Sequence, residues 1–183
     1  MNLRSYLLPG DVCYNLYLVN IKKVYNGSGG GNMDTVETMK KSDVFSHLSE
    51  EDLGEVAKLC RYEEFEAGTT IFRQDTAATD MYIVEDGLVS IMLELGPTDR
   101  RQIQAVSDFG CFSWPAVIPP YHHISTAKAL EKTRVLAFDG KQLCELVNIN
   151  PRLCAEIMAG IAYVMAQKLR MSFTQLMGVT YQD

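Results

Sequence analysis

The sequence lacks a long uninterrupted apolar run and an excess of basic residues. No segment approaches the roughly 20 apolar residues that a membrane-spanning helix needs. The N-terminus also lacks the charged, apolar and cleavage-site pattern of a secretory signal peptide. Lys and Arg number 17 against 23 Asp and Glu, a formal net charge of -6. We therefore expect a cytoplasmic protein that contacts no membrane and, lacking a basic surface, binds no nucleic acid directly.

Paired cysteines, histidine clusters and catalytic motifs are missing as well. The five cysteines are scattered without a C-x-x-C pair, which predicts reduced thiols and no metal knuckle or redox motif. His47, His122 and His123 are the only histidines, too few and too dispersed to predict a metal site. No G-x-S-x-G or H-E-x-x-H motif is present. We expect neither an enzyme nor a resident cofactor.

The chain of 183 residues is long enough for one domain with tails. Residues 1–32 form a separate segment that ends in a glycine-rich run, typical of a flexible linker. The run lacks the lysine that closes a phosphate loop. An alternative for this segment is that the natural protein starts at Met33, because codons for the glycine-rich run can embed a ribosome-binding site. We expect a domain over 33–150 and a dimerisation helix over 151–178.

Hydrophobic spacing predicts helix from Val44 to Leu59, with Ser49 as an N-terminal cap. The dipeptide Asp86-Gly87 lies between two apolar runs and indicates a hairpin, because glycine accepts the positive φ of a tight turn. Several short strands at such spacing are typical of a barrel or a jelly-roll-like sandwich. The predicted strands are 62–65, 70–72, 81–84, 88–93, 102–106, 125–130 and 135–138.

Two further helices are predicted near the C-terminus. Asp139 is expected to cap a helix through Leu146, and Asn150-Pro151 to open a long one that ends near Met177. The long helix is apolar on two sides, which predicts that one face lies on the domain and the other on a second copy in a homodimer. We assign Ile161 and Val164 to the partner-facing stripe. The alternative is a helix packed wholly within its own domain.

Two segments of the sequence resemble those of a known family. They are 65–72, Phe-Glu-Ala-Gly-Thr-Thr-Ile-Phe, and 81–91, Met-Tyr-Ile-Val-Glu-Asp-Gly-Leu-Val-Ser-Ile. From about Phe45 to Leu176 the chain resembles the cyclic-nucleotide-binding domains of the catabolite-activator (Crp/Fnr) family and of protein kinase A regulatory subunits. The resemblance implies a mainly β fold with flanking helices: a jelly-roll-like β-roll followed by a long C-terminal helix. It also implies a small-ligand pocket built by a phosphate-binding cassette.

The family's cassette uses a Glu for a ribose hydroxyl and an Arg for the cyclic phosphate. In the ungapped match Trp114 occupies the Glu position and His123 the Arg position. A shifted match places residues 109–111 on the family's F-G-E and needs an insertion before His123, and it supplies no carboxylate either. The segment is more similar to a bacterial cassette of the form G-W-S-A-L-V-x-P-Y. Cyclic AMP is therefore expected to bind weakly or not at all.

Both unusual residues have two interpretations. Trp114 either stacks on a ligand or fills the core. Neighbouring side chains on a strand face opposite ways, so at most one of His122 and His123 points into the pocket, and spacing favours His123. Near or below neutral pH, it could offer a cationic donor to an anion. The candidate ligand-binding residues are Trp114, Pro115, Ala116, His123, Ser125 and Thr126.

These observations predict a stand-alone regulatory module. It senses a small ligand, a cyclic nucleotide or another compound, or acts as a signalling and interaction module, and its long helix passes the signal to a homodimer partner or an effector protein. The alternative is a Crp/Fnr-type transcription regulator that is truncated or works through a DNA-binding partner, because no helix-turn-helix is recognisable after the long helix.

Overall fold

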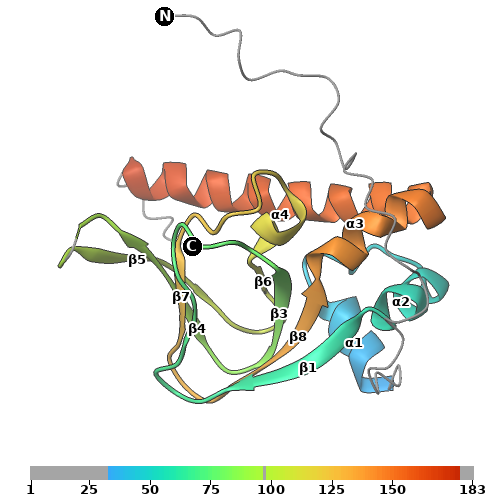
Figure 1. Cartoon of the computed structure of the whole chain (residues 1–183), viewed down its shortest axis with the longest axis horizontal. Coiled ribbons are helices and arrows are strands. Elements are labelled where there is room, and N and C mark those ends of the chain that lie inside the picture. The colour runs from blue at the N-terminus through green and yellow to red at the C-terminus, as the bar shows by residue number, and fades with distance from the viewer. Residues whose placement is uncertain (1–32, 97, 178–183) are drawn as a thin grey trace, which may run out of the picture.

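The computed structural model describes residues 33–96 and 98–177, so the predicted tail 1–32 and residue 178 lie outside the described residues. Within them, two four-stranded antiparallel sheets face each other to form a β-roll, and helices flank it (Figure 1). The helices are α1 (Met33–Lys41), α2 (Glu50–Ala57), α3 (Gly140–Ile149) and α4 (Pro151–Leu176).

The strand order follows a jelly-roll-like path, in which neighbours in a sheet are far apart in the chain. One sheet has the order β1 (Cys60–Phe65), β8 (Thr133–Asp139), β3 (Asp80–Asp86), β6 (Cys111–Phe112). The other has the order β2 (Thr70–Phe72), β7 (Thr126–Ala129), β4 (Val89–Glu94), β5 (Arg100–Val106). The predicted fold, a mainly β roll with flanking helices and a long C-terminal helix, is confirmed. All seven predicted strands are present, whereas β6 and α1 were not predicted.

The hairpin predicted at Asp86-Gly87 is wrong. Gly87 does have a positive φ of 106°, but β3 pairs with β6 and β8 while β4 pairs with β5 and β7. The turn carries the chain from one sheet to the other. Its geometry is fixed by Thr133, whose Oγ1 accepts from the backbone N–H of Leu88 at 3.3 Å and would lie 2.6 Å from a Cβ on Gly87.

Helix boundaries follow the predicted caps. Ser49 Oγ accepts from the backbone N–H of Asp52 at 3.2 Å, and Asp139 Oδ1 accepts from Gln142 at 3.0 Å. Asn150 Oδ1 accepts from the backbone N–H of Leu153 at 3.1 Å. The helix predicted from Val44 is shorter than expected, because residues 43–47 form turns and α2 starts only after its Ser49 cap.

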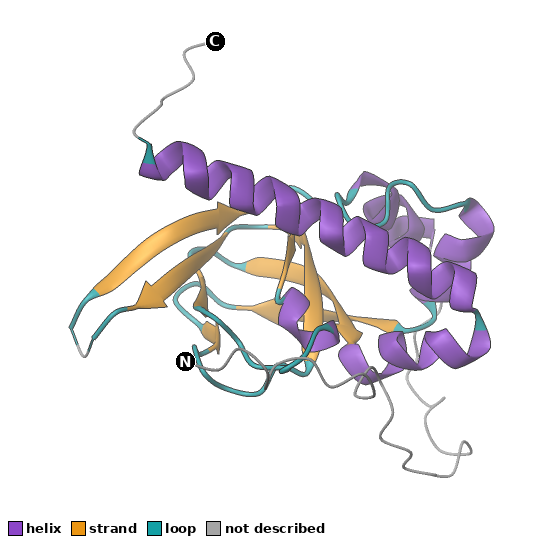
Figure 2. Ribbon diagram, turned by 90° about the horizontal axis from the view of Figure 1, so that it is seen from above, coloured by secondary structure: helices purple, strands orange, loops and turns teal. Residues whose placement is uncertain are grey.

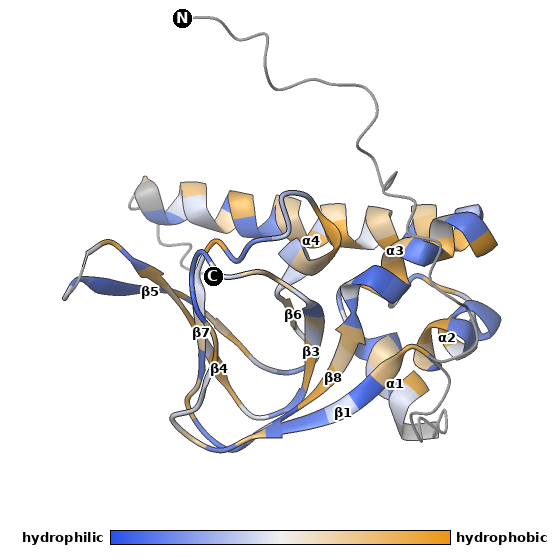
Figure 3. Cartoon of the chain, in the orientation of Figure 1, coloured by the Kyte–Doolittle hydropathy of each residue, from blue (hydrophilic) through white to orange (hydrophobic). Residues whose placement is uncertain are grey.

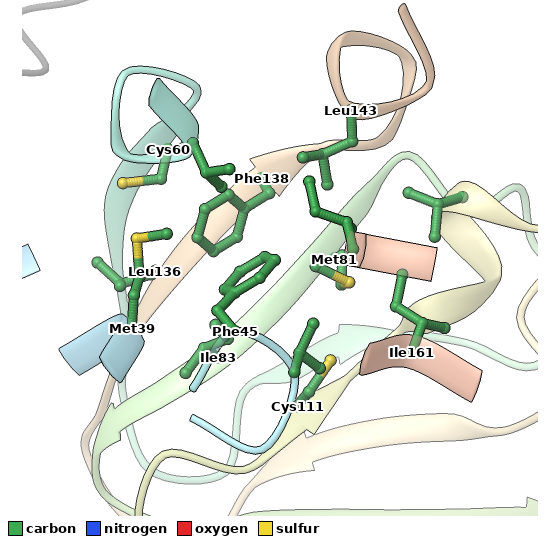
Figure 4. Close-up of a cluster of buried hydrophobic side chains, with 14 of the residues drawn as sticks. Met39, Phe45, Cys60, Met81, Ile83, Cys111, Leu136, Phe138, Leu143 and Ile161 are labelled. Carbon is green, nitrogen blue, oxygen red and sulfur yellow. The ribbon is translucent and has the colours of Figure 1, made fainter. Parts of the chain in front are cut away.

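Two cores share the central strands. On β3, Met81 and Ile83 face a core beneath the helices, whereas Tyr82 and Val84 face a second core inside the roll. β8 alternates in the same way, so both strands read as continuous apolar runs. The helix-side core is drawn in Figure 4, where Ile161 of α4 lies on its margin.

The assignment of Ile161 and Val164 to a partner-facing stripe is wrong. Both side chains are buried in the core of their own domain, as are Ile157 and Leu153, one and two turns before Ile161 on α4. The four positions face the domain because α4 runs along the open side of the roll, across its strands (Figure 2). Among the described helices, none is long and apolar enough to cross a membrane.

Candidate ligand pocket

A cavity of about 420 Å³ lies between the β-roll and α4. Strands β2, β4, β5 and β6 supply one wall, and α4 supplies the other from Met165 to Gln175. Residues 113–115 and 123–125, which flank a loop, complete the lining. The lining is mostly apolar with a few polar groups, as in typical small-molecule sites. The cassette predicted from the sequence therefore borders a real cavity.

Ser113 fixes the backbone conformation just before the cassette helix. Its φ is 61°, in the left-handed region, and its Oγ donates to the backbone oxygen of Asp80 at 2.6 Å. This turn presents Trp114 at the start of a short 3-10 helix, η2 (Trp114–Val117), with Pro115 in its first turn. Trp114 is half-buried: it packs on the helix-side core and also lines the cavity. The two interpretations of this residue are thus compatible.

His123 lies inside the cavity wall and His122 lies outside. The two are not on a named strand; an isolated bridge pairs His122 with Ala77. The backbone N–H of His123 donates to Thr76 at 2.8 Å, and its carbonyl accepts from Asp75 at 2.8 Å. These bonds fix the segment, so His123 is 5% exposed while His122 is exposed and its Nδ1 contacts the backbone oxygen of Pro120.

The imidazole of His123 is a neutral ring at pH 7. It stacks on Phe72 with ring centroids 3.7 Å apart and an angle of 4° between the planes. Burial lowers the pKa of His123 to about 4, and His122 nearby adds to this effect. The cationic donor expected from the sequence is therefore absent at neutral pH. Its Nδ1 is buried and has no hydrogen-bond partner among the described residues.

Four of the six predicted site residues line the cavity: Trp114, Pro115, His123 and Ser125. The other two lie outside the lining. Ala116 belongs to the helix-side core, and its carbonyl lies against Gly140. The Oγ1 of Thr126 donates to Glu94 at 2.7 Å and accepts from the backbone of Gln74 at 2.9 Å, so this hydroxyl supports the β2 end of the roll.

The α4 side of the cavity was not predicted from the sequence. Lys168, Ser172 and Gln175 line it, together with Gln104 of β5. Their three-to-four-residue spacing on α4 places them on one helical face, but nothing in the sequence indicates which part of the roll that face covers. The Nζ of Lys168 donates to the backbone oxygen of Cys111 at 2.9 Å. Burial lowers the pKa of Lys168, and nearby Cys111 and Asp43 partly oppose this.

A second cavity, of about 520 Å³, lies between α1 and the first sheet. It is larger, but it is remote from the cassette. Most of its charged groups are engaged in ion pairs: Arg134 bonds to Glu85, which also accepts from Thr38 at 3.2 Å, and Glu37 pairs with Lys40 at 3.2 Å. The Lys41 ammonium lies 5.1 Å from the centre of the Phe109 ring. Because these groups satisfy one another, the cassette cavity is the better candidate site.

The cassette geometry agrees with a family assignment. Residues 62–150, which span most of the roll and the whole cassette, match the family model of the cyclic nucleotide-binding domain. This segment belongs to the cyclic nucleotide-binding domain family. The members of that family are regulatory domains, and the domain here lacks a Glu–Arg pair at the cassette positions, which hold Trp114 and His123.

Proteins of different kinds are similar to this chain in sequence or in fold. A candidate potassium channel protein of Rhodopseudomonas palustris is 32% identical over 114 residues, or 62% of this chain, but the match spans only 27% of that protein. A cyclic nucleotide-binding domain from Methylobacillus flagellatus has a TM-score of 0.71 and 13% identity, covering 82% of this chain and 84% of its own. The catabolite activator protein of Thermus thermophilus has a TM-score of 0.64 and 20% identity, covering 74% and 62%. These two show the shared fold.

Proposed function

We propose that this chain is a regulatory module that senses a small ligand in the cassette cavity and transmits the signal through α4, without catalysing a reaction. One observation carries the proposal: α4 forms a wall of the cavity and also presents an exposed apolar face. Residues from Met165 to Gln175 line the cavity. A ligand that fills it therefore contacts the element best placed to reach a partner.

The partner we propose is a second copy of the chain. On the side of α4 away from the core, exposed apolar residues recur at alternating intervals of four and three, the spacing of a coiled-coil seam. Figure 3 shows hydrophobic colour recurring along α4 between hydrophilic segments. The seam consists of Ala155, Ala159, Ala162, Ala166, Leu169 and Phe173. Ala166 and Leu169 also border the cassette cavity, so the seam and the cavity meet along this part of α4.

Exposure of the larger seam residues supports this arrangement. Leu169 is 55% exposed and Phe173 is 56% exposed. A contiguous apolar stripe of this kind is typical of an interaction surface. The small alanines let two helices approach closely, while Leu169 and Phe173 widen the contact at the C-terminal end. We infer a homodimer through α4, with an effector protein acting on that dimer.

The cytoplasm is the compartment we propose. Cys60 and Cys111 are buried thiols, and burial raises their pKa values to about 11 and about 12. Such thiols are unreactive, as suits a reducing compartment. The net charge of -6 argues that any action on DNA runs through a DNA-binding partner.

Native mass spectrometry of the full chain tests both parts of the proposal. We expect a mass of two chains and a small molecule retained after gentle purification. Trp114 is the single tryptophan and lines the cavity, so its fluorescence should change when the retained compound is removed and added back. A monomer would contradict dimerisation. An emission spectrum that is insensitive to the retained compound would contradict the assigned pocket. Turnover of the compound, with or without added metal ions, would show an enzyme instead.

A further inference from the structure

The larger of the two cavities described above lies between α1 and the first sheet. Its volume of about 520 Å³ is in the range of small-molecule sites. Helix α1 supplies one wall, and strands β1, β3 and β8 supply the other, together with Phe109 from the loop before β6. No described residue lines both this cavity and the cassette cavity. A molecule bound here would therefore contact a different set of residues from a ligand in the cassette.

The lining of this cavity has one positive charge in excess, at Lys41. Glu37 pairs with Lys40 at 3.2 Å, and Glu85 pairs with Arg134, so each carboxylate of the lining already has a cation. Lys41 is exposed and forms an ion pair with no described carboxylate. Arg134 keeps donors free as well, because only its Nε donates to Glu85 and its two terminal nitrogens bond to no described side chain. The groups left without a partner are thus cationic donors, which suit an anion.

An unusual backbone conformation brings Phe109 to this cavity. The φ angles of Asp108 and Phe109 are 42° and 68°, in the left-handed region that side chains other than glycine rarely adopt. The backbone N–H of Phe109 donates to the carbonyl of Val84 at 2.9 Å and fixes the turn. The Lys41 ammonium lies 5.1 Å from the centre of the Phe109 ring. A cation–π contact at an exposed site is weaker than a charge-assisted hydrogen bond, so Lys41 remains able to bind an anion.

Two aromatic rings line the same cavity. Beside the ring of Phe109, β1 contributes Tyr62, whose ring is exposed. The hydroxyl oxygen of Tyr62 lies 3.1 Å from Oγ1 of Thr35, a hydrogen bond that holds the side chain between β1 and α1. Aromatic side chains favour stacked or edge-on contact with other rings. The lining therefore combines unpaired cationic donors with surfaces that suit a ring.

We propose that this cavity is a second ligand site and binds an aromatic carboxylate. The carboxylate pairs with Lys41 and with the free terminal nitrogens of Arg134, whose planar fork matches carboxylate geometry. The ring packs against Tyr62 or Phe109. One uncompensated positive charge suits a monoanion better than a phosphate dianion. The inference goes beyond the proposed function, because it concerns other residues and does not depend on what the cassette binds.

Matched pairs of compounds test the site and the charge together. Benzoate and benzamide share a ring and differ in charge at neutral pH, as do indole-3-acetate and indole-3-acetamide. Each is titrated into the ¹⁵N-labelled full chain and followed by NMR. The backbone amides of Lys41 and Phe109 report on this cavity, and the indole N–H of Trp114 reports on the cassette cavity. We expect at least one acid to shift the Lys41 and Phe109 resonances and to bind about tenfold more tightly than its amide, because only the acid forms charge-assisted hydrogen bonds with both cations.

Three outcomes of these titrations would overturn the proposal. Amides that bind as well as their acids would exclude an anion as the recognised group. Shifts confined to Trp114 would place the compounds in the cassette cavity instead, and would leave the proposed function intact. The absence of a shift at Lys41 and Phe109 with either acid would exclude the site.

Variants identify the cation. Lys41→Gln removes the unpaired charge at an exposed position of α1, and the acid should lose about threefold to fivefold in affinity, as expected for an exposed ion pair. Lys141→Gln is the matched control, because Lys141 is an exposed lysine of α3 that lines neither cavity. It changes the net charge equally and should bind the acid normally. Equal affinity in the two variants would overturn the role of Lys41, and the order of acid and amide in the unmodified chain tests the ligand class even if Lys41→Gln unfolds.

Discussion

Gly160 of α4 packs directly against the backbone oxygen of Val44. A Cβ on Gly160 would overlap that oxygen and would lie 2.8 Å from Cε1 of His47. This close approach lets the buried residues of α4 pack against the turn that follows α1. A glycine in the middle of a long helix, unfavourable by its helix propensity, is explained by this contact.

Replacing Gly160 with alanine should therefore destabilise the domain. Overpacking of this kind costs about 1–3 kcal/mol, against a gain of about 1 kcal/mol in helix propensity. Gly54 of α2, with no atom within 4 Å of a built Cβ, is the matched control. Gly54→Ala should raise stability by about 0.5–1 kcal/mol. Urea unfolding measures both; a Gly160→Ala variant as stable as Gly54→Ala would refute the contact.

Acid should weaken the fold through His123. Burial lowers its pKa from 6.5 to about 4, so between these values the unfolded chain binds a proton that the native chain does not. The free energy of unfolding therefore falls as the pH falls through this window. The loss between pH 7 and pH 5 is about 2 kcal/mol. Free energies of unfolding at the two pH values should differ less in His123→Phe than in His122→Phe. Identical pH dependence in both variants would argue against a buried neutral His123.

A single charge on the exposed face of α4 should dissociate the dimer. Ala162→Glu places a carboxylate in the middle of the seam, where a partner helix would bury it without a counter-charge. Gln167→Glu adds the same charge to an exposed position of α4 off the seam and should remain dimeric. Sedimentation velocity distinguishes the two. Glutamate at Ile161 or Val164 is not a test of dimerisation, because both side chains lie in the domain core and the variants would unfold.

Cyclic AMP should bind at least about a hundredfold more weakly than to a relative with the Glu–Arg pair. Truncating one partner of a buried charged pair costs roughly 2–5 kcal/mol. An unpaired buried ribose hydroxyl adds roughly 1–3 kcal/mol, and each 1.4 kcal/mol is tenfold. Isothermal titration with cyclic AMP and cyclic GMP checks this. A dissociation constant of a few micromolar or less for either nucleotide would show that Trp114 and His123 serve as substitutes.

Local rules in the sequence account for most element boundaries. The caps at Ser49, Asp139 and Asn150 act within three residues of themselves, so the sequence alone predicts them. The alternating strands follow equally from the period of two along an extended chain. In contrast, β6 is two residues long, and its pairing with β3 exists only because the roll closes around it. The same closure turns Asp86-Gly87 into a bend between sheets.

The candidate site, too, was predictable from the sequence only in part. The cassette segment that holds Trp114 and His123, and the absence from it of the family's Glu and Arg, were evident from the residues themselves. The burial of His123, the isolation of its Nδ1 and the contribution of Lys168 were decided by the packing of α4 across the roll. Helical spacing shows which residues share a face of α4, but both faces are apolar. Which face enters the core depends on the fit of Gly160 against Val44, a contact between segments more than a hundred residues apart that only the tertiary structure brings together.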